Sequence, residues 1–347
     1  MRPVSICAAL ALAIAAGTPQ AGDSITEQLQ THQLNLEPDG KAFLIDEAGR
    51  ASFLLVGGMH GDRETPALVQ ALAIGVGKFG YQRTAVEMSP WSAAQLEASL
   101  RKSGAAVNIS GADIEEVQPH LPIRELAGAN PQNRALQSMA ELVKSGYERS
   151  LAPQLLQLAT EMGDVKDVIA GGVSLRKLVL GTLEVESIRS KGQRFDASVR
   201  REAFMKELFI THYRAATQGQ TKPKFLVSFG QSHLGRGIDE RGVSTLGNFI
   251  GELAAAEGMK SFHVLLFAAG GKYSLHGLHE IDQRKDAAAF ALLASLARYP
   301  AAVFDMRPVR PLLHALPVPR SERDSSLMYW ADAYDVIICY REITPAG

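Results

Sequence analysis

Residues 54–66, LLVGGMHGDRETP, decide how the rest of the sequence is interpreted. An apolar run that is typical of a buried strand passes through two glycines and a methionine into His60, which another glycine follows. Thr65 and the proline after it are typical of a helix start and predict a helix over residues 66–78. Ligands of open α/β sheets bind beyond the carboxyl ends of the strands. We therefore expect His60 and Glu64 to lie in an active-site crevice, where the helix start offers N–H groups to an anion.

Two further strand ends carry titratable side chains. Residues 225–237, FLVSFGQSHLGRG, run from an apolar strand into His233, so the pattern Gly-x-x-His occurs twice in the same setting. Residues 83–88 form a short predicted strand with Glu87 near its carboxyl end. Burying a carboxylate costs free energy unless it is paired, so Glu87 is expected to have a partner such as a histidine or a metal ion. The alternatives are that Glu87 only marks where its strand reaches the surface, and that His60 only caps a loop while Glu64 is a solvated carboxylate of the first helical turn.

The remaining pattern alternates apolar strands with helices, which predicts an α/β fold with a mostly parallel central sheet flanked by helices. Residues of about 92–215 have few strand signals and are expected to form a helical insertion over the cleft. Arg201 lies late in this insertion, and its guanidinium can bind a carboxylate or polarise a carbonyl. A turn-like sequence at 47–50 predicts a hairpin between two strands. That hairpin joins residues 41–46 and 51–57; further expected strands are 224–229, 262–267, 301–305 and 335–340, and further expected helices are 92–102, 133–144, 199–214, 245–256 and 286–298.

The composition excludes some classes of protein. The chain has 347 residues with 36 Lys and Arg and 37 Asp and Glu, a formal net charge of −1, which gives no electrostatic argument for nucleic-acid binding. Residues 1–21 are expected to be a secretory signal peptide, because Arg2 precedes an apolar run about half as long as a membrane span. A retained anchor is the alternative. Cleavage would leave 22–347 as a single domain in the periplasm or outside the cell, with no stable membrane span and with Cys339 as its one cysteine.

Several familiar site motifs fail on their context. Residues 75–80 match Gly-x-Gly-x-x-Gly, but a helix precedes them and a strand follows, the reverse of the dinucleotide-binding order, so they are expected to end the helix. His276 and His279 lie three residues apart in a glycine-rich stretch and are expected to be solvated. The sequence has no Gly-x-Ser-x-Gly elbow, no phosphate-binding loop of the Walker type and no His-Glu-x-x-His motif.

Taken together, these residues resemble the erythromycin-esterase-like superfamily, which includes the TraB/GumN and Tiki-type proteins and the ChaN-like haem-binding proteins. The resemblance covers about residues 43–345 and implies a sheet-based α/β domain, a helical part over a deep cleft and a histidine base that acts on water. In the esterase pattern a glutamate lies three residues before the His-Gly, and that position is Gly57 here. The segment instead looks like the Gly-x-x-His of the TraB/GumN and Tiki group. The matching residues are His60, Gly61, Glu64, Glu87, Arg201, Glu202, Met205, His233, 245–247 and 335–338.

Three functions follow from the motifs and the resemblance. In the favoured one, a secreted or periplasmic hydrolase cleaves a small-molecule ester or lactone without a cofactor. His60 takes a proton from water, and Glu87 or Glu64 orients its imidazole. Arg201 and His233 stabilise the oxyanion. In the second, His60, Glu87 and His233 bind a divalent metal ion that assists ester or peptide hydrolysis, as in Tiki-type proteins. In the third, the protein is a ChaN-like binder of haem or another ligand.

Overall fold

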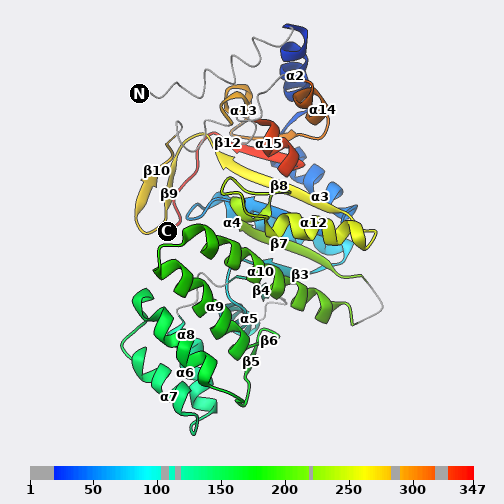
Figure 1. The fold of residues 1–347 in the computed structure, drawn as a ribbon. Coiled ribbons are helices and arrows are strands. Elements are labelled where there is room, and N and C mark those ends of the chain that lie inside the picture. The colour runs from blue at the N-terminus through cyan, green and yellow to red at the C-terminus, as the bar shows by residue number, and fades with distance from the viewer. Residues whose placement is uncertain (1–18, 103–108, 114–118, 219–221, 283–289, 317–326) are drawn as a thin grey trace, which may run out of the picture. The chain divides into compact units, whose positions relative to one another are not determined.

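The computed structural model describes residues 19–347 except 103–108, 114–118, 219–221, 283–289 and 317–326 (Figure 1). The chain divides into two compact units, a first unit of residues 1–81 and 226–347 and a second unit of residues 82–225. Residues 1–18 of the predicted signal peptide lie outside the described residues, and helix α2 (Pro19–Thr31) begins directly after them. Within the described ranges, no helix combines the length and the apolar character that crossing a membrane requires.

The strands form a central sheet in the order β1-β11-β12-β8-β2-β7-β3-β4. Strands β2 and β12 pair with β8 in parallel, and β4 pairs with β3 in parallel, whereas β1 and β11 make an antiparallel edge beside β12. The expected mostly parallel α/β sheet is therefore confirmed. The strands are β1 (Gln33–Asn35), β2 (Phe53–Gly58), β3 (Tyr81–Val86), β4 (Ile109–Gly111), β7 (Lys224–Gly230), β8 (Ser261–Ala268), β11 (Ala301–Asp305) and β12 (Val336–Tyr340). Of these eight strands, β4, β3 after Tyr81 and the first two residues of β7 belong to the second unit, and the rest belong to the first.

The core of the first unit forms where apolar strands meet amphipathic helices. Leu54 and Val56 of β2 and Val264 of β8 are fully buried in one cluster with Leu68 and Leu72 of helix α4 (Glu64–Val76), whose spacing of four places them on one helix face. The other helical elements of this unit are η1 (Leu36–Gly40), α3 (Lys41–Gly49), η2 (Gly77–Phe79), α11 (Gln231–Leu234), α12 (Leu246–Ala256), α13 (Ala291–Leu296), α14 (Arg310–His314) and α15 (Leu327–Ala333), and a small hairpin joins β9 (Lys272–Ser274) to β10 (Leu278–Glu280).

The predicted hairpin is wrong in its first strand. Residues 41–46 lie in helix α3, which runs on through 47–49, and only the second strand exists, as β2. The buried Leu44 and Ala48 are four residues apart, a helical spacing that was overlooked. The glycines of 75–80 do end a helix as predicted, and Gly80 has a φ of +87°. The described part of the predicted helix 286–298 is α13.

The second unit is mainly helical and contains the stretch of about 92–215 that was predicted to be a helical insertion. Side chains cap two of its helices, since Asn133 accepts a hydrogen bond from the backbone N–H of Leu136 and Ser174 accepts one from that of Lys177. Its elements are α5 (Pro90–Lys102), α6 (His120–Ala129), α7 (Arg134–Leu142), η3 (Arg149–Leu151), α8 (Ala152–Glu161), β5 (Ile169–Ala170), β6 (Val173–Ser174), α9 (Leu175–Ser190) and α10 (Arg194–Ala216).

Candidate active site

His60 lies in an exposed loop two residues beyond the end of β2, the strand that the sequence predicted to lead to it. The glycines around it are required by packing. A Cβ atom at Gly58 would collide with the side chain of Thr65, and one at Gly61 with the carbonyl oxygen of Ser274. Gly61 also has a φ of +79°, which a side chain rarely tolerates. The glycines therefore fix the shape of the loop that presents His60.

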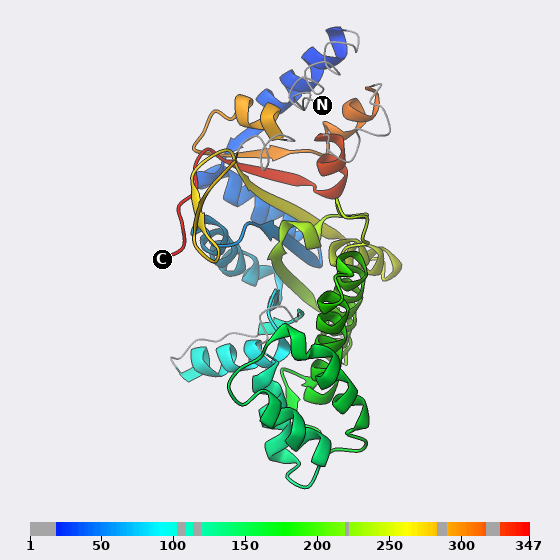
Figure 2. The same cartoon turned by 60° about the vertical axis from the view of Figure 1, so that its left-hand side comes forward.

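The loop is tied to the hairpin and to the last described residues of the chain. The carbonyl of Gly61 accepts hydrogen bonds from the backbone N–H groups of Ser274 and Ala346, both at 2.8 Å. Figure 2 shows the β9–β10 hairpin beside this last segment, and Lys272 and Ile343 join the two through a backbone hydrogen bond of 3.0 Å. The loop that carries His60 is thus held from two sides.

Glu64 turns toward the same C-terminal segment. Its carboxylate accepts hydrogen bonds from the backbone N–H of Thr344 at 3.1 Å and from the hydroxyl of Thr344 at 2.7 Å. Arg63 adds a backbone hydrogen bond to the carbonyl of Thr344. The described contacts of Glu64 therefore give it a structural task at the start of α4.

Asp62 is a residue that the sequence analysis missed. It is only 4% exposed, and its Oδ1 accepts a hydrogen bond of 2.6 Å from the backbone N–H of Thr65. This contact uses an N–H group that was expected to be available to an anion. Its Oδ2 is buried and has no hydrogen-bond partner among the described residues, and burial raises the pKa of this carboxyl group. The spacing Asp-x-x-Thr before an apolar run is the cap signal that would have found it.

The two Gly-x-x-His segments meet within the first unit. A Cβ atom on Gly57 would lie 3.2 Å from the Cα of Gln231 and 2.9 Å from the hydroxyl oxygen of Tyr334. Position 57 therefore has no room for the glutamate of the esterase pattern unless the backbone moves. Gln231 begins helix α11, whose third residue is His233, so the second segment lies directly against the end of the strand that leads to His60.

His233 is buried, with 4% exposure, and does not stand free at a strand end. Helix α11 packs against β2 and β8. The carbonyl of Leu234 accepts a hydrogen bond of 2.8 Å from Nδ1 of His263, which pairs opposite Leu55 in the sheet. Helix α11 begins with Gln231 beside Gly57 and ends with Leu234 beside His263, which pairs with the earlier residue Leu55. The helix therefore runs back over the face of the sheet, and His233 lies between these two points.

The second unit brings together two other predicted residues. Arg201 of α10 donates from Nη2 to the Glu87 carboxylate at 3.0 Å, so Glu87 pairs with an arginine, whereas a histidine or a metal ion was expected. Arg201 also donates to both oxygens of Asp113, from Nε at 3.0 Å and from Nη2 at 2.7 Å. Asp113 is fully buried and follows the three-residue strand β4. It was missed because so short a strand gives no hydrophobic pattern.

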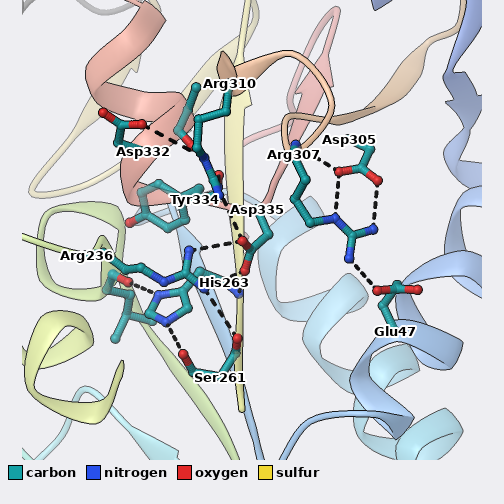
Figure 3. Close-up of polar contacts among 12 residues, drawn as sticks. Glu47, Arg236, Ser261, His263, Asp305, Arg307, Arg310, Asp332, Tyr334 and Asp335 are labelled. Carbon is teal, nitrogen blue, oxygen red and sulfur yellow. Dashed lines mark hydrogen bonds and ion pairs between the residues drawn. The ribbon is translucent and has the colours of Figure 1, made fainter. Parts of the chain in front are cut away.

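A third cluster lies near the beginnings of β8 and β12 in the first unit (Figure 3). Arg236 donates to both carboxylate oxygens of Asp335, at 3.0 and 2.6 Å, and Arg310 donates to the same group at 3.3 Å. Burial alone would raise the pKa of Asp335, but the hydrogen bonds and charge of Arg236 more than offset it and keep the pKa below its ordinary value. His263, fully buried beside this group, was not predicted because it stands inside an apolar strand.

His279 is solvated, as predicted, and the described residues show no cluster of metal ligands. His279 is exposed and its Nε2 contacts the carbonyl of Leu275 at 2.8 Å within the β9–β10 hairpin. Across the described ranges, no three His, Cys, Asp or Glu side chains gather in a way that would hold a metal ion. The proposed ligand set of His60, Glu87 and His233 therefore stays a prediction from the resemblance.

The fold is similar to that of several solved protein structures. No protein-family profile matches the sequence, and no curated protein matches it in sequence. Three solved structures are similar over almost their whole length. A Bacillus cereus protein has a TM-score of 0.61 at 12% identity and covers 93% of this chain and 98% of its own. A succinoglycan biosynthesis protein has a TM-score of 0.60 at 13% identity, with coverages of 94% and 98%.

The third neighbour is a mutant of the erythromycin esterase EreC in its open conformation. Its TM-score is 0.59 at 12% identity, and the alignment covers 92% of this chain and 97% of that one. At this level of identity the similarity concerns the arrangement of strands and helices. The chain therefore has an erythromycin-esterase-like fold, as the sequence motifs implied.

Proposed function

We propose that this protein is a hydrolase that cleaves an ester or lactone bond of a small molecule, with His60 as the general base. The observation that carries the proposal is the meeting of the two Gly-x-x-His segments at Gly57 and Gln231, one of which presents an exposed imidazole beyond a parallel strand. Ligands of α/β sheets bind at that edge. The fold shared with an erythromycin esterase supports the same class of reaction.

In the proposed reaction, His60 takes a proton from a water molecule whose oxygen attacks the carbonyl carbon of the substrate. The resulting tetrahedral intermediate carries a negative oxygen, which His233 and Arg201 are proposed to stabilise. The intermediate collapses and expels the alcohol, which takes the proton back from His60. Glu87 or Glu64 is proposed to orient the imidazole. The proposed reaction uses neither a cofactor nor a metal ion.

The test is hydrolysis of a panel that contains p-nitrophenyl butyrate, small aliphatic lactones and erythromycin. A general base of this kind typically contributes about 10²–10⁴-fold, so H60A should lose activity by that factor while its circular dichroism and melting temperature stay unchanged. H279A, which removes another exposed histidine of the same unit, is the matched control and should hydrolyse at the wild-type rate. Equal rates in wild type and H60A on every substrate that is cleaved would contradict the proposal.

The same panel tests the supporting residues. E87Q and R201K should lower kcat if these side chains take part in the chemistry. E64Q should lower kcat only if Glu64 acts beyond its contact with Thr344. A variant that changes the melting temperature but leaves kcat unchanged would assign its residue to structure alone.

We also propose that the protein acts in the periplasm or outside the cell, on the strength of its predicted signal peptide. Cys339 fits such a compartment, because it is buried and burial raises the pKa of its thiol to about 12, which disfavours the reactive thiolate. Cell fractionation and N-terminal sequencing of the mature protein test this proposal. A full-length protein in the cytoplasm would contradict it.

A further inference from the structure

The short helix that carries His233 is held from outside at several points. The carbonyl of Gln231 accepts a hydrogen bond from the hydroxyl of Tyr334, and the carbonyl of Gly235 accepts one from the hydroxyl of Thr245. Burial raises the pKa of the Tyr334 hydroxyl well above its ordinary value, which keeps it a donor. A helix of four residues has almost no stability of its own. These outside contacts therefore decide where α11 lies.

His263 contacts the backbone directly beside His233. Its Nδ1 lies 2.8 Å from the carbonyl oxygen of Leu234, the residue that follows His233, and its Nε2 lies 2.9 Å from the hydroxyl of Ser261 (Figure 3). A carbonyl oxygen can only accept, so Nδ1 carries the hydrogen and Nε2 accepts from Ser261 in the neutral ring. The ring therefore links the backbone beside His233 to strand β8.

The surroundings of His263 keep its ring in the neutral form that this arrangement requires. Burial, together with the charge of Arg236, lowers the pKa of His263 to about 3, so the ring is neutral at pH 7. Asp335 fixes the same strand, because it accepts a hydrogen bond of 3.0 Å from the backbone N–H of His263. A fully buried imidazole among apolar strand residues costs free energy unless both of its nitrogens are satisfied, and here both are.

We propose that His263 is a positioning residue, whose Nδ1–H holds the carbonyl of Leu234 and thereby sets the place of the His233 imidazole. This inference rests on the proposed function, in which His233 stabilises the oxyanion. A misplacement of about 1 Å costs a catalytic group on the order of 10²-fold in rate.

Two substitutions separate the two ring nitrogens. The amide nitrogen of asparagine can take the place of Nδ1, so H263N keeps a donor for the carbonyl of Leu234. The amide nitrogen of glutamine takes the place of Nε2, so H263Q keeps only the contact with Ser261. S261A is the matched control, because it removes the partner of Nε2 and leaves the bond to Leu234 in place.

The experiment measures kcat and KM on p-nitrophenyl butyrate and the ring ¹H–¹³C NMR signal of His233, assigned by its loss in H233A. H263Q should lose on the order of 10²-fold in kcat with KM unchanged, and its His233 signal should shift or split. H263N and S261A should stay close to wild type in both readouts. Equal losses in H263N and H263Q that follow their losses in melting temperature would mean a merely structural role and would overturn the inference.

One measurement needs no variant. In wild-type protein at pH 7, ¹⁵N spectra should show His263 protonated at Nδ1 only, and a ring protonated at Nε2 or at both nitrogens would overturn the inference. The NMR readouts do not depend on hydrolysis. Wild-type protein that cleaves no substrate but shows the expected His233 signals would therefore contradict the proposed function and leave the positioning contact established.

Discussion

Two arginine–aspartate pairs, one in each unit, use the same geometry in opposite surroundings. Arg236 and Asp335 join residues 99 apart in the first unit, and Arg201 and Asp113 join residues 88 apart in the second. Each pair has two parallel hydrogen bonds, the bidentate geometry that arginine favours. The first pair is supplemented by another cation, Arg310, and the second by another carboxylate, Glu87.

The pairs also differ in their access to water. The side chain of Arg236 is 30% exposed, whereas those of Arg201 and Asp113 are 7% and 0% exposed. Water can solvate the arginine of the first pair when its partner is lost, but it cannot reach the second pair. The Arg201–Asp113 pair therefore fixes helix α10 to the residues that follow β3 and β4. The Arg236–Asp335 pair fixes the backbone around α11.

The largest expected effect comes from breaking the buried Arg201–Asp113 pair. D113N should lower the free energy of unfolding of the second unit by about 3–5 kcal/mol, because it removes the charge of the carboxylate that pairs with the buried guanidinium of Arg201. The protein has two tryptophans, Trp91 in the second unit and Trp330 in the first. Urea unfolding followed by fluorescence in the W330F background therefore reports the second unit. A loss below about 1 kcal/mol would show that burial does not make this pair costly to break.

D335N should have a smaller effect on the first unit, about 1.5–3 kcal/mol, the usual range for hydrogen bonds to charged groups. Arg236 and Arg310 can turn toward water when the carboxylate is neutralised, which limits the cost. The measurement uses the W91F background, in which Trp330 reports unfolding. If D335N cost more than D113N, exposure would not be what distinguishes the two pairs.

Lowering the pH should destabilise the first unit through its buried His263. The pKa of His263 is about 3 in the folded protein and near 6.5 in the unfolded chain. Between these values only the unfolded chain binds the proton, so stability is full above pH 6.5 and falls by about 1.4 kcal/mol per pH unit as the pH drops toward 3. H263N should flatten this slope between pH 6.5 and 4.5 in the W91F background.

His212 in the second unit is the matched control for that slope. Burial lowers the pKa of His212, and the charge of Arg83 lowers it further. The hydrogen bond from its Nε2 to the carbonyl of Gly111 acts in the opposite direction but does not offset them. H212N should therefore flatten the acid slope of the second unit and leave that of the first unchanged. An H263N protein with the wild-type slope would show that the buried ring does not control acid unfolding.

E87Q should have the smallest effect on stability, at most about 1 kcal/mol, because Asp113 still neutralises Arg201 and the amide oxygen still accepts a hydrogen bond. Unfolding in the W330F background measures it. A larger loss would show that the two carboxylates share the arginine equally. A loss of hydrolysis without a loss of stability would assign Glu87 to the chemistry.

The sequence predicted the elements that depend on local pattern. The strands around Leu54, Phe225 and Val264 are continuous apolar runs, and such runs identify buried strands without any knowledge of their neighbours. The error at residues 41–46 arose where a short apolar run fits either periodicity. The glycine-flanked pattern at a strand end predicted that His60 lies in a loop beyond β2, since strand direction alone places a residue at the edge of a sheet.

The partners of the site residues came only from the tertiary structure. The sequence did not predict the contacts of Asp113, His263 and Asp335, because each one binds a residue about 30 to 100 positions away. The sequence also could not show that α11 turns back over the sheet, which buries His233 instead of exposing it at a strand end.

The fold class, the approximate strand ends and the loop position of His60 could thus be predicted from the sequence, because periodicity and chain direction are local properties. Only the folded structure shows which charges pair, which carboxylate accepts a hydrogen bond at the start of α4, and that a Cβ atom at position 57 would press against Tyr334 and Gln231. Those facts depend on the close approach of segments that the chain separates widely, and only the packing of the folded protein fixes that approach.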